Sequence, residues 1–284
     1  MLPVVALIVP PDQPPELVLE AAREAEGRGI EELWLWEDCF ATSGLAPAAA
    51  ILGGTQRLRV GIGLMPVPLR AAALTAMEIA TLARMFPGRF RPGLGHGVRE
   101  WMAQAGVAVD SPLTLLREHT EAIIALLRGQ EVSRAGRYVQ LDRVRLRHPP
   151  EVVPGVLVGG RGPRTLAVAG ELADGVIVDD AAPKGSPSPD RVREVIDQVV
   201  QARKAAGREG RPDVVAFLPT ADGVTAEQLG VHLRTLGEAG ATTVAALAGG
   251  VDGPPHAGDQ LIGFVDVLAQ ASDVLAQASD GLRG

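Results

Sequence analysis

The chain has 284 residues, of which 46% are hydrophobic and 21% are charged, and its formal net charge is −7. This composition supports one large core and excludes a disordered chain, while the negative charge gives no general attraction to nucleic acid or to an anionic membrane. The single cysteine, Cys39, excludes an intrachain disulfide and a multi-cysteine metal site. We expect a cytoplasmic protein with one domain, residues 1–284, and a small-molecule substrate.

Short β-branched runs alternate with longer amphipathic stretches along the chain, and each pair predicts a strand followed by a helix. The predicted strands are 4–9, 33–36, 58–64, 89–94, 156–158, 175–178, 214–218 and 243–247. The predicted helices are about 14–28, 46–52, 71–85, 113–127, 164–173, 190–206, 226–239 and a C-terminal helix at about 258–279. The apolar run at the start is broken by Pro10 and Pro11, so it predicts a first strand and not a signal peptide.

One polar stretch, about 129–153, interrupts this alternation. Its segment RYVQLDRVRLRH alternates with period two, which predicts a small hairpin-like insertion between units four and five. Eight β–α units at this length predict an α/β fold, a (β/α)8 TIM barrel. A doubly wound sheet is the alternative, but it needs a glycine-rich turn after its first strand, and here that turn reads PPDQPP.

A duplication occurs near the C-terminus, where the sequence DVLAQAS at 266–272 recurs at 273–279. Seven added residues preserve the apolar face of a helix, so we interpret the repeat as a lengthening of the last helix. A packing role between subunits is the alternative.

Sites in this fold lie at the C-terminal ends of the strands. Glu37 and Asp38 follow the second strand, where two carboxylates can carry acid–base chemistry, or can act as a helix cap and a solvated acid. His96 lies between Gly95 and Gly97 after the fourth strand, a position that fits a functional and a structural histidine equally well. Cys39 is interpreted as a packed residue and not as a nucleophile.

The turn after the fifth strand, GGRGPRT at 159–165, is the sharpest physical signal. Glycines leave backbone N–H groups accessible, the start of the following helix is electropositive, and Pro163 fits the first helical turn. Arg161 and Arg164 add positive charge. We predict a phosphate site here.

Several kinds of chemistry lack the residues that they need. The sequence has no H-x-H pair at a strand end, no G-x-S-x-G elbow, and no lysine within a predicted strand, since only Lys184 and Lys204 are present. These absences argue against a metal site, a serine nucleophile and a Schiff base. We therefore predict that a bound organic cofactor supplies the reactive group.

At these residues the chain resembles the bacterial luciferase-like superfamily of flavin- and deazaflavin-dependent oxidoreductases. The segments LRVGIGLMPVPLR, PGRFRPGLGHGVREW and PGVLVGGRGPRTLAVAGELADGVIV occur in that family's order, and the likeness extends over about residues 4–247. The chain is most similar to the branch that uses coenzyme F-420, which includes methylenetetrahydromethanopterin reductases. Dimers are common in this family, so the resemblance is compatible with a homodimer, although the oligomeric state stays open.

The resemblance implies roles for particular residues. An acid near the deazaflavin corresponds to Asp38, and a non-prolyl cis peptide against the ring corresponds to Gly63 and Leu64. Contacts to the ring and its side chain correspond to the turn after the fourth strand, and the phosphate turn corresponds to the one after the fifth. The cofactor-binding residues so implied are Asp38, Gly63, Leu64, Gly95, His96, Gly97, Gly160, Arg161, Gly162 and Pro163.

This sequence departs from several family members, in which a histidine follows the acid, because Cys39 occupies that position. The proton donor or acceptor therefore stays open between Glu37, Asp38 and His96. The resemblance implies hydride transfer between C5 of the deazaflavin and a small organic substrate, with FMN-dependent monooxygenation and non-catalytic cofactor binding as alternatives. We expect a substrate pocket lined by Trp36, Phe40, Met65 and Trp101, with its far wall formed by the loops 181–189 and 249–258.

Overall fold

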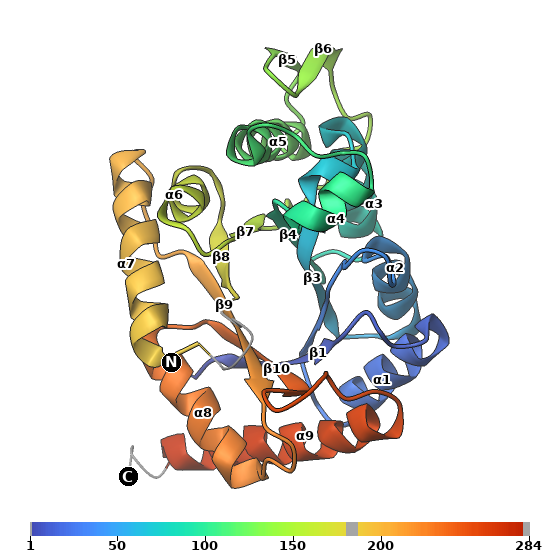
Figure 1. Cartoon of the computed structure of the whole chain (residues 1–284), viewed down its shortest axis with the longest axis vertical. Helices are drawn as coiled ribbons and strands as arrows, with labels where there is room; N and C mark the ends of the chain where they lie inside the picture. Colours follow the sequence, from blue (N-terminus) through green and yellow to red (C-terminus); the bar gives the residue numbers. More distant parts are fainter. Residues whose placement is uncertain (1, 180–186, 281–284) are drawn as a thin grey trace.

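The computed structural model describes residues 2–179 and 187–280, in which the strands form a closed parallel barrel surrounded by helices (Figure 1). Around the barrel the strands follow the order β1-β10-β9-β8-β7-β4-β3-β2. They are β1 (Val4–Val9), β2 (Glu32–Leu35), β3 (Arg59–Pro66), β4 (Phe90–Gly95), β7 (Leu157–Gly159), β8 (Gly175–Val178), β9 (Asp213–Thr220) and β10 (Thr243–Gly250). The predicted TIM barrel is confirmed, and closure of the sheet excludes the doubly wound alternative.

Helices connect successive barrel strands, as parallel pairing requires. They are α1 (Pro15–Gly27), α2 (Leu45–Gly54), α3 (Ala72–Met85), α4 (Arg99–Gln104), α5 (Pro112–Leu127), α6 (Pro163–Leu172), α7 (Pro189–Ala205), α8 (Ala226–Ala239) and α9 (Asp259–Asp280), with a short 3-10 turn, η1 (Val67–Leu69). None of the helices in this part of the chain combines the length and the apolarity that crossing a bilayer requires.

The predicted insertion is an antiparallel hairpin formed by β5 (Val132–Ala135) and β6 (Gln140–Val144). It forms a separate two-stranded sheet, because β4 pairs directly with β7 in the barrel. In Figure 1 the hairpin stands outside the ring of helices, beyond α5. The barrel therefore carries an added element beside the end of its fourth unit.

The structure differs from the sequence prediction in a few places. Helix α4 lies in a segment that the sequence analysis treats as a loop, because six residues are too few to display a helical period. Strands β9 and β10 end at Thr220 and Gly250, two and three residues beyond their predicted ends. Pairing between these two strands continues through Pro219 and past a register shift, so tertiary pairing overrides the turn-forming residues.

Apolar side chains fill the interior of the barrel, and Trp34 is the largest of them. Its ring occupies the space beside Gly61, where an added Cβ would lie 2.5 Å from the ring. Crowding within the barrel therefore requires glycine at this position without any ligand.

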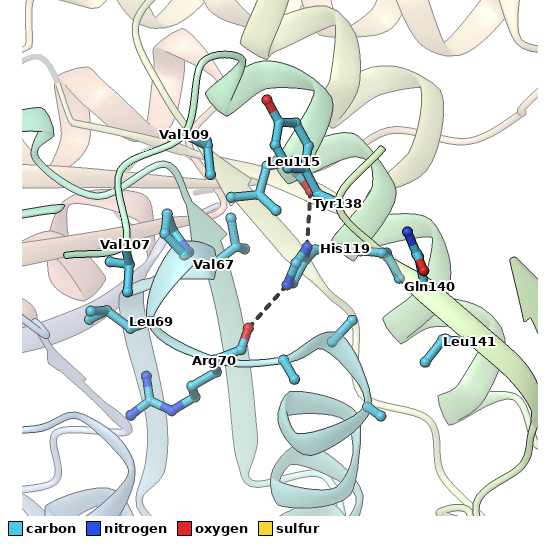
Figure 2. Close-up of a pocket in the computed structure, with 15 residues that line it drawn as sticks. Val67, Leu69, Arg70, Val107, Val109, Leu115, His119, Tyr138, Gln140 and Leu141 are labelled. Carbon is cyan, nitrogen blue, oxygen red and sulfur yellow. Dashed lines mark hydrogen bonds between the residues drawn. The ribbon is translucent and has the colours of Figure 1, made fainter. Parts of the chain in front are cut away.

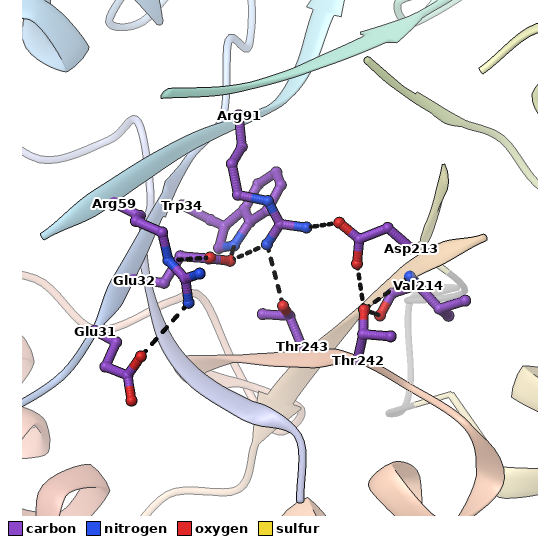
Figure 3. Close-up of polar contacts among 9 residues, drawn as sticks. All are labelled: Glu31, Glu32, Trp34, Arg59, Arg91, Asp213, Val214, Thr242 and Thr243. Atoms are coloured by element: carbon purple, nitrogen blue, oxygen red, sulfur yellow. Dashed lines mark hydrogen bonds and ion pairs between the residues drawn. The ribbon is translucent and has the colours of Figure 1, made fainter. Parts of the chain in front are cut away.

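A buried polar network lies at the N-terminal ends of the strands (Figure 3). Glu32 is fully buried, and its carboxylate accepts a hydrogen bond from Trp34 Nε1 at 2.7 Å and pairs with Arg59 at 3.2 Å. Arg91 pairs with both Glu32 and Asp213, and its guanidinium lies 5.2 Å from the centre of the Trp34 ring. Sequence reasoning missed this network, because each strand contributes only one or two of its residues.

We predict that Arg91→Met destabilises the protein, because it leaves the Glu32 carboxylate buried without its main partner. The expected loss is about 3 kcal/mol in the free energy of unfolding, measured by urea denaturation. Arg145→Met is the matched control, since Arg145 is exposed on the segment after the hairpin, and it should change stability by less than about 0.5 kcal/mol. Equal stability of the two variants would show that the network contributes nothing.

Candidate active site

Glu37 and Asp38 follow β2 and are neighbours in sequence, but their side chains have different surroundings. Asp38 is half-buried, and burial raises its pKa to about 6, assisted by the negative charges of Asp12 and Asp179. Asp12 follows β1 and Asp179 follows β8, so three strand ends bring carboxylates to one opening of the barrel. Sequence reasoning missed the other two acids, although both stand within three residues of a strand end. Asp38 can therefore exchange a proton near neutral pH.

Glu37 is buried and forms a bidentate ion pair with Arg70, with hydrogen bonds of 2.9 Å and 2.5 Å. Arg70 also lies 3.4 Å from Glu78. Both carboxylate oxygens of Glu37 are occupied by this pair, so the structure gives Glu37 an anchoring contact and does not add it to the acids at the opening. Its predicted part in proton transfer gains no support from the geometry.

The end of β3 forms the floor of the opening. The Gly63–Leu64 peptide bond is cis, which is the bond that the family resemblance implies. Leu64 packs on the interior core, and its side chain fills the space beside Gly95 and Gly159, where an added Cβ would lie 2.4 Å and 2.6 Å from it. These two glycines are therefore needed for packing. Contact of Gly63, Leu64 and Gly95 with a cofactor remains a prediction.

His96 joins the turn after β4 to the start of α6. Its Nε2 lies 2.9 Å from Oγ1 of Thr165, and burial lowers the pKa of the imidazole. Because its charged form is disfavoured, His96 is a neutral hydrogen-bonding group at neutral pH. Gly97, beside it, has a φ of +71°, a conformation that suits glycine.

Both glycine-rich turns line one pocket with a volume of about 930 Å³. Its polar lining includes His96, Arg99, Arg164 and Asp110. Asp110 pairs with Arg137 at 3.1 Å, whereas no carboxylate in the described ranges lies within ion-pair distance of Arg99 or Arg164. The first turn of α6 also faces it, at Gly162 and Pro163, and no side chain caps this helix. Uncapped N–H groups and two arginine side chains form a donor set suited to phosphate or carboxylate.

Only part of the predicted phosphate turn lines the pocket. Gly162 and Pro163 line the pocket, whereas Gly160 packs on Thr165, where an added Cβ would lie 2.4 Å from the Thr165 side chain. Arg161 donates from Nε to the backbone oxygen of Asp179 at 2.6 Å, so it points toward the end of β8. Gly160 and Arg161 are not among the residues that line the pocket.

The four residues expected to line a substrate pocket differ in their exposure and in what they pack against. Trp36 is half-buried 6.0 Å from the Phe217 ring, Phe40 is 70% exposed, and Trp101 is half-buried on α4. Met65 corrects the prediction, because it is 1% exposed and packs in the layer between the strands and the helices. Gly61 and Gly63 face the interior, and the register shift between Ile62 and Met65 breaks this alternation, so that Met65 faces away from the interior.

Loops at the opening are tied to one another. Gln13, in the loop after β1, donates to the backbone oxygen of His256 at 3.0 Å and accepts from the N–H of Gly258 at 2.9 Å. The His256 ring lies 2.8 Å from Asp222, which follows β9. The predicted wall 249–258 is thus held in place, while residues 180–186 of the other predicted wall lie outside the described residues.

These residues fit an anionic cofactor that contains a ring. Trp36 Nε1 is buried, and it has no hydrogen-bond partner in the part of the chain that the structure describes. Trp36 and Leu64 both pack on the interior core from the open end. A donor without an acceptor, an apolar floor and a cationic pocket beside them match the needs of a phosphorylated ring system.

The sequence of the chain is similar to those of known proteins. A family model described as luciferase-like monooxygenase matches residues 4–251. The 5,10-methylenetetrahydromethanopterin reductase of Methanolobus tindarius is 27% identical over 208 residues, which cover 73% of this chain and 62% of that protein. The F-420-dependent glucose-6-phosphate dehydrogenase of Nakamurella multipartita is 27% identical over 176 residues, which cover 57% and 52%. Across the first three curated relatives, the alignments span 48% to 62% of their length.

Solved structures share the fold at low sequence identity. An F-420-dependent secondary alcohol dehydrogenase, solved with an F-420–acetone adduct, superposes with a TM-score of 0.79 at 17% identity and covers 95% of this chain and 99% of that one. A monooxygenase from Streptomyces bottropensis superposes with a TM-score of 0.75 at 16% identity and covers 94% and 98%. At these identities the likeness establishes the fold alone.

We predict that Asp38→Asn stabilises the protein at pH 8. The pKa of this carboxyl is about 6 in the folded chain and 3.8 in the reference state, so its charged form opposes folding, and wild-type stability falls as pH rises from about 4 through 6. The advantage of the variant should vanish below pH 4, where both side chains are neutral. Urea unfolding across this pH range measures it, with exposed Asp142→Asn as the control. A constant difference between Asp38→Asn and wild type would contradict the shifted pKa.

Proposed function

Because this chain belongs to the luciferase-like monooxygenase family, we propose that it is a coenzyme F-420-dependent oxidoreductase that transfers a hydride to or from a small organic substrate. The pocket of about 930 Å³ carries the proposal, since it sets a cationic lining beside the opening that contains Asp38. Support also comes from relatives named as F-420-dependent dehydrogenases and as 5,10-methylenetetrahydromethanopterin reductases.

The chain's own residues would hold the cofactor at two ends. Arg164 and the uncapped start of α6 would bind its phosphate, and Arg99 would bind a further anionic group. Trp36 Nε1 would donate to a ring oxygen, and Leu64 would support the ring from below. When bound, the deazaflavin supplies a carbon, C5, that donates or accepts a hydride.

Proton transfer is assigned to Asp38 among the three candidates that the sequence left open. Its pKa of about 6 keeps both protonation states accessible near neutral pH. Glu37 is held by Arg70, and His96 is linked through Nε2 to Thr165 at the cofactor pocket, where burial lowers the pKa of the imidazole. Asp38 would therefore exchange a proton with the substrate atom that gains or loses charge during hydride transfer, while Trp36, Phe40 and Trp101 exclude water.

Cofactor choice is tested by titrating the protein with F-420 and with FMN, with bound cofactor measured by fluorescence. We expect micromolar affinity for F-420 and much weaker binding of FMN. Arg164→Ala should weaken F-420 binding about tenfold, because a charge-assisted hydrogen bond contributes roughly 1.5–3 kcal/mol. Arg145→Ala, outside the pocket, is the control.

The other outcomes decide between the alternatives. Binding of FMN alone, with oxygen uptake in its reduced form, would identify a monooxygenase, which the family description and solved FMN-dependent neighbours favour. F-420 binding without turnover on imines, enones and alcohols would identify a non-catalytic homologue.

We also propose a homodimer, based on the outer face of α3. Leu74, Met77 and Met85 are 46%, 54% and 64% exposed there, and a cluster of large apolar side chains on one helix face is typical of a subunit interface. Light scattering should give twice the chain mass, and Met77→Glu should shift it toward the monomer. A monomeric wild type at high concentration would refute this assembly.

A further inference from the structure

The inserted hairpin is tied to the barrel by a buried carboxylate. Glu118, on α5, accepts three hydrogen bonds, at 2.8, 2.8 and 2.9 Å, from the backbone N–H groups of Arg137, Tyr138 and Val139. Gly136 packs against the same carboxylate, where an added Cβ would lie 2.6 Å from Glu118 Oε2. These contacts fix the turn between β5 and β6 in one position on α5.

The side chain of Tyr138 reaches from this turn to the loop before α5. A cavity of about 380 Å³ lies between the hairpin and η1, and Tyr138 forms part of its wall (Figure 2). In that view the Tyr138 hydroxyl points away from His119. The hydroxyl oxygen accepts a hydrogen bond from the backbone N–H of Ser111, 27 residues away, at 2.9 Å. The phenol therefore fixes the backbone at Ser111.

A second contact between the hairpin and this loop is weaker. Arg137 pairs with Asp110 at 3.1 Å, and its guanidinium lies 5.1 Å from the centre of the Tyr138 ring. Both members of the ion pair are exposed, so water screens it and it contributes little. The main link is therefore the hydrogen bond between Ser111 and Tyr138.

Ser111 stands directly before the first turn of α5. Its Oγ lies 2.7 Å from Oγ1 of Thr114, and no side chain caps the start of this helix. The first N–H groups of a helix are electropositive when no cap satisfies them. Ser111, Pro112 and Leu113 line the cofactor pocket of about 930 Å³, so the start of α5 forms part of its wall.

The start of α6 lines the same pocket. It is also uncapped, and it contributes Gly162, Pro163 and Arg164 to the lining. Two helix starts attract one bound anion more strongly than one does, provided that both lie close to it. Helix α6 follows the barrel strand β7 after three residues, whereas α5 follows the loop 105–111. The start of α5 therefore depends on other contacts for its position.

We infer that Tyr138 is a positioning residue for the cofactor. Through the Ser111 N–H it holds the start of α5 at the distance from α6 at which both helix starts act on one anionic group. This inference rests on the proposed function, because that group belongs to the proposed cofactor. It gives the inserted hairpin a part in cofactor binding, although residues 132–144 themselves do not line the pocket.

The test is Tyr138→Phe, which removes the accepting oxygen and keeps the ring. The Kd for F-420, measured by fluorescence, should rise about fivefold, as expected for the loss of one neutral hydrogen bond. Inorganic phosphate, titrated by phosphorus NMR, should lose affinity by the same factor, because it would occupy the same two helix starts. A merely structural role would lower the urea midpoint of unfolding and leave both binding constants of the folded protein unchanged.

Ser133→Ala is the matched control. The Ser133 hydroxyl accepts a hydrogen bond from the Arg143 N–H at 3.0 Å, so this change loosens the hairpin without touching its link to Ser111. Both binding constants should stay at the wild-type values. Glu118→Gln is a second variant, which sets a side-chain amide against the N–H groups of the turn, and it should weaken F-420 binding at least as much as Tyr138→Phe does.

The outcomes separate this inference from the proposed function. If Tyr138→Phe binds F-420 as tightly as wild type, or if Ser133→Ala weakens binding equally, the positioning role is wrong and F-420 dependence stands. If wild type binds phosphate but not F-420, and Tyr138→Phe weakens phosphate binding, the proposed function is wrong and the role of Tyr138 at the anion site stands. Failure of wild type to bind either ligand would overturn both.

Discussion

Filling the interior of a closed barrel is the constraint on which the rest of this structure depends. Eight strands leave a narrow space, and Trp34 fills so much of it that Gly61 can carry no side chain. Farther up, Leu64 takes the space beside Gly95 and Gly159. Glycines that look like ligand contacts in the sequence are thus fixed first by packing. The same packing creates the flat apolar floor on which a ring could rest.

Carboxylates have different surroundings at the two ends of the barrel. At the N-terminal end, Arg91 lies between the buried Glu32 and the partly exposed Asp213 and pairs with both carboxylates. At the open end, burial and the negative charges of Asp12 and Asp179 raise the pKa of Asp38 to about 6. Proteins commonly sacrifice stability at functional sites. The ion pairs at the N-terminal end contribute to stability, whereas the buried charge of Asp38 at the other end reduces it.

Much of the fold could be predicted because its signals are local. Strand β1 and helix α8 have the boundaries that the sequence predicts, since Thr225 and Gln228 form a capping box and Gly240 ends α8 with a φ of 113°. The cis bond at Gly63 was implied only by resemblance.

What could not be predicted depends on contacts between distant segments. Glu37 and Asp38 read alike in the sequence, and only the position of Arg70, 33 residues from Glu37, separates their roles. Met65 seemed suited to a pocket because it lies in a glycine-rich segment, yet the register shift between Ile62 and Met65 places it in the outer layer. Pattern alone carries no information about which partner a side chain meets.

The inserted hairpin is linked to the pocket at the open end of the barrel through the loop before α5. The pocket of about 930 Å³ is lined by the two glycine-rich turns, by Arg164 and by the loop before α5. The Tyr138 oxygen accepts a hydrogen bond from the Ser111 N–H at 2.9 Å, and Arg137 pairs with Asp110 at 3.1 Å. Ser111 and Asp110 line the pocket of about 930 Å³, so changes in the hairpin can reach that pocket through the loop before α5.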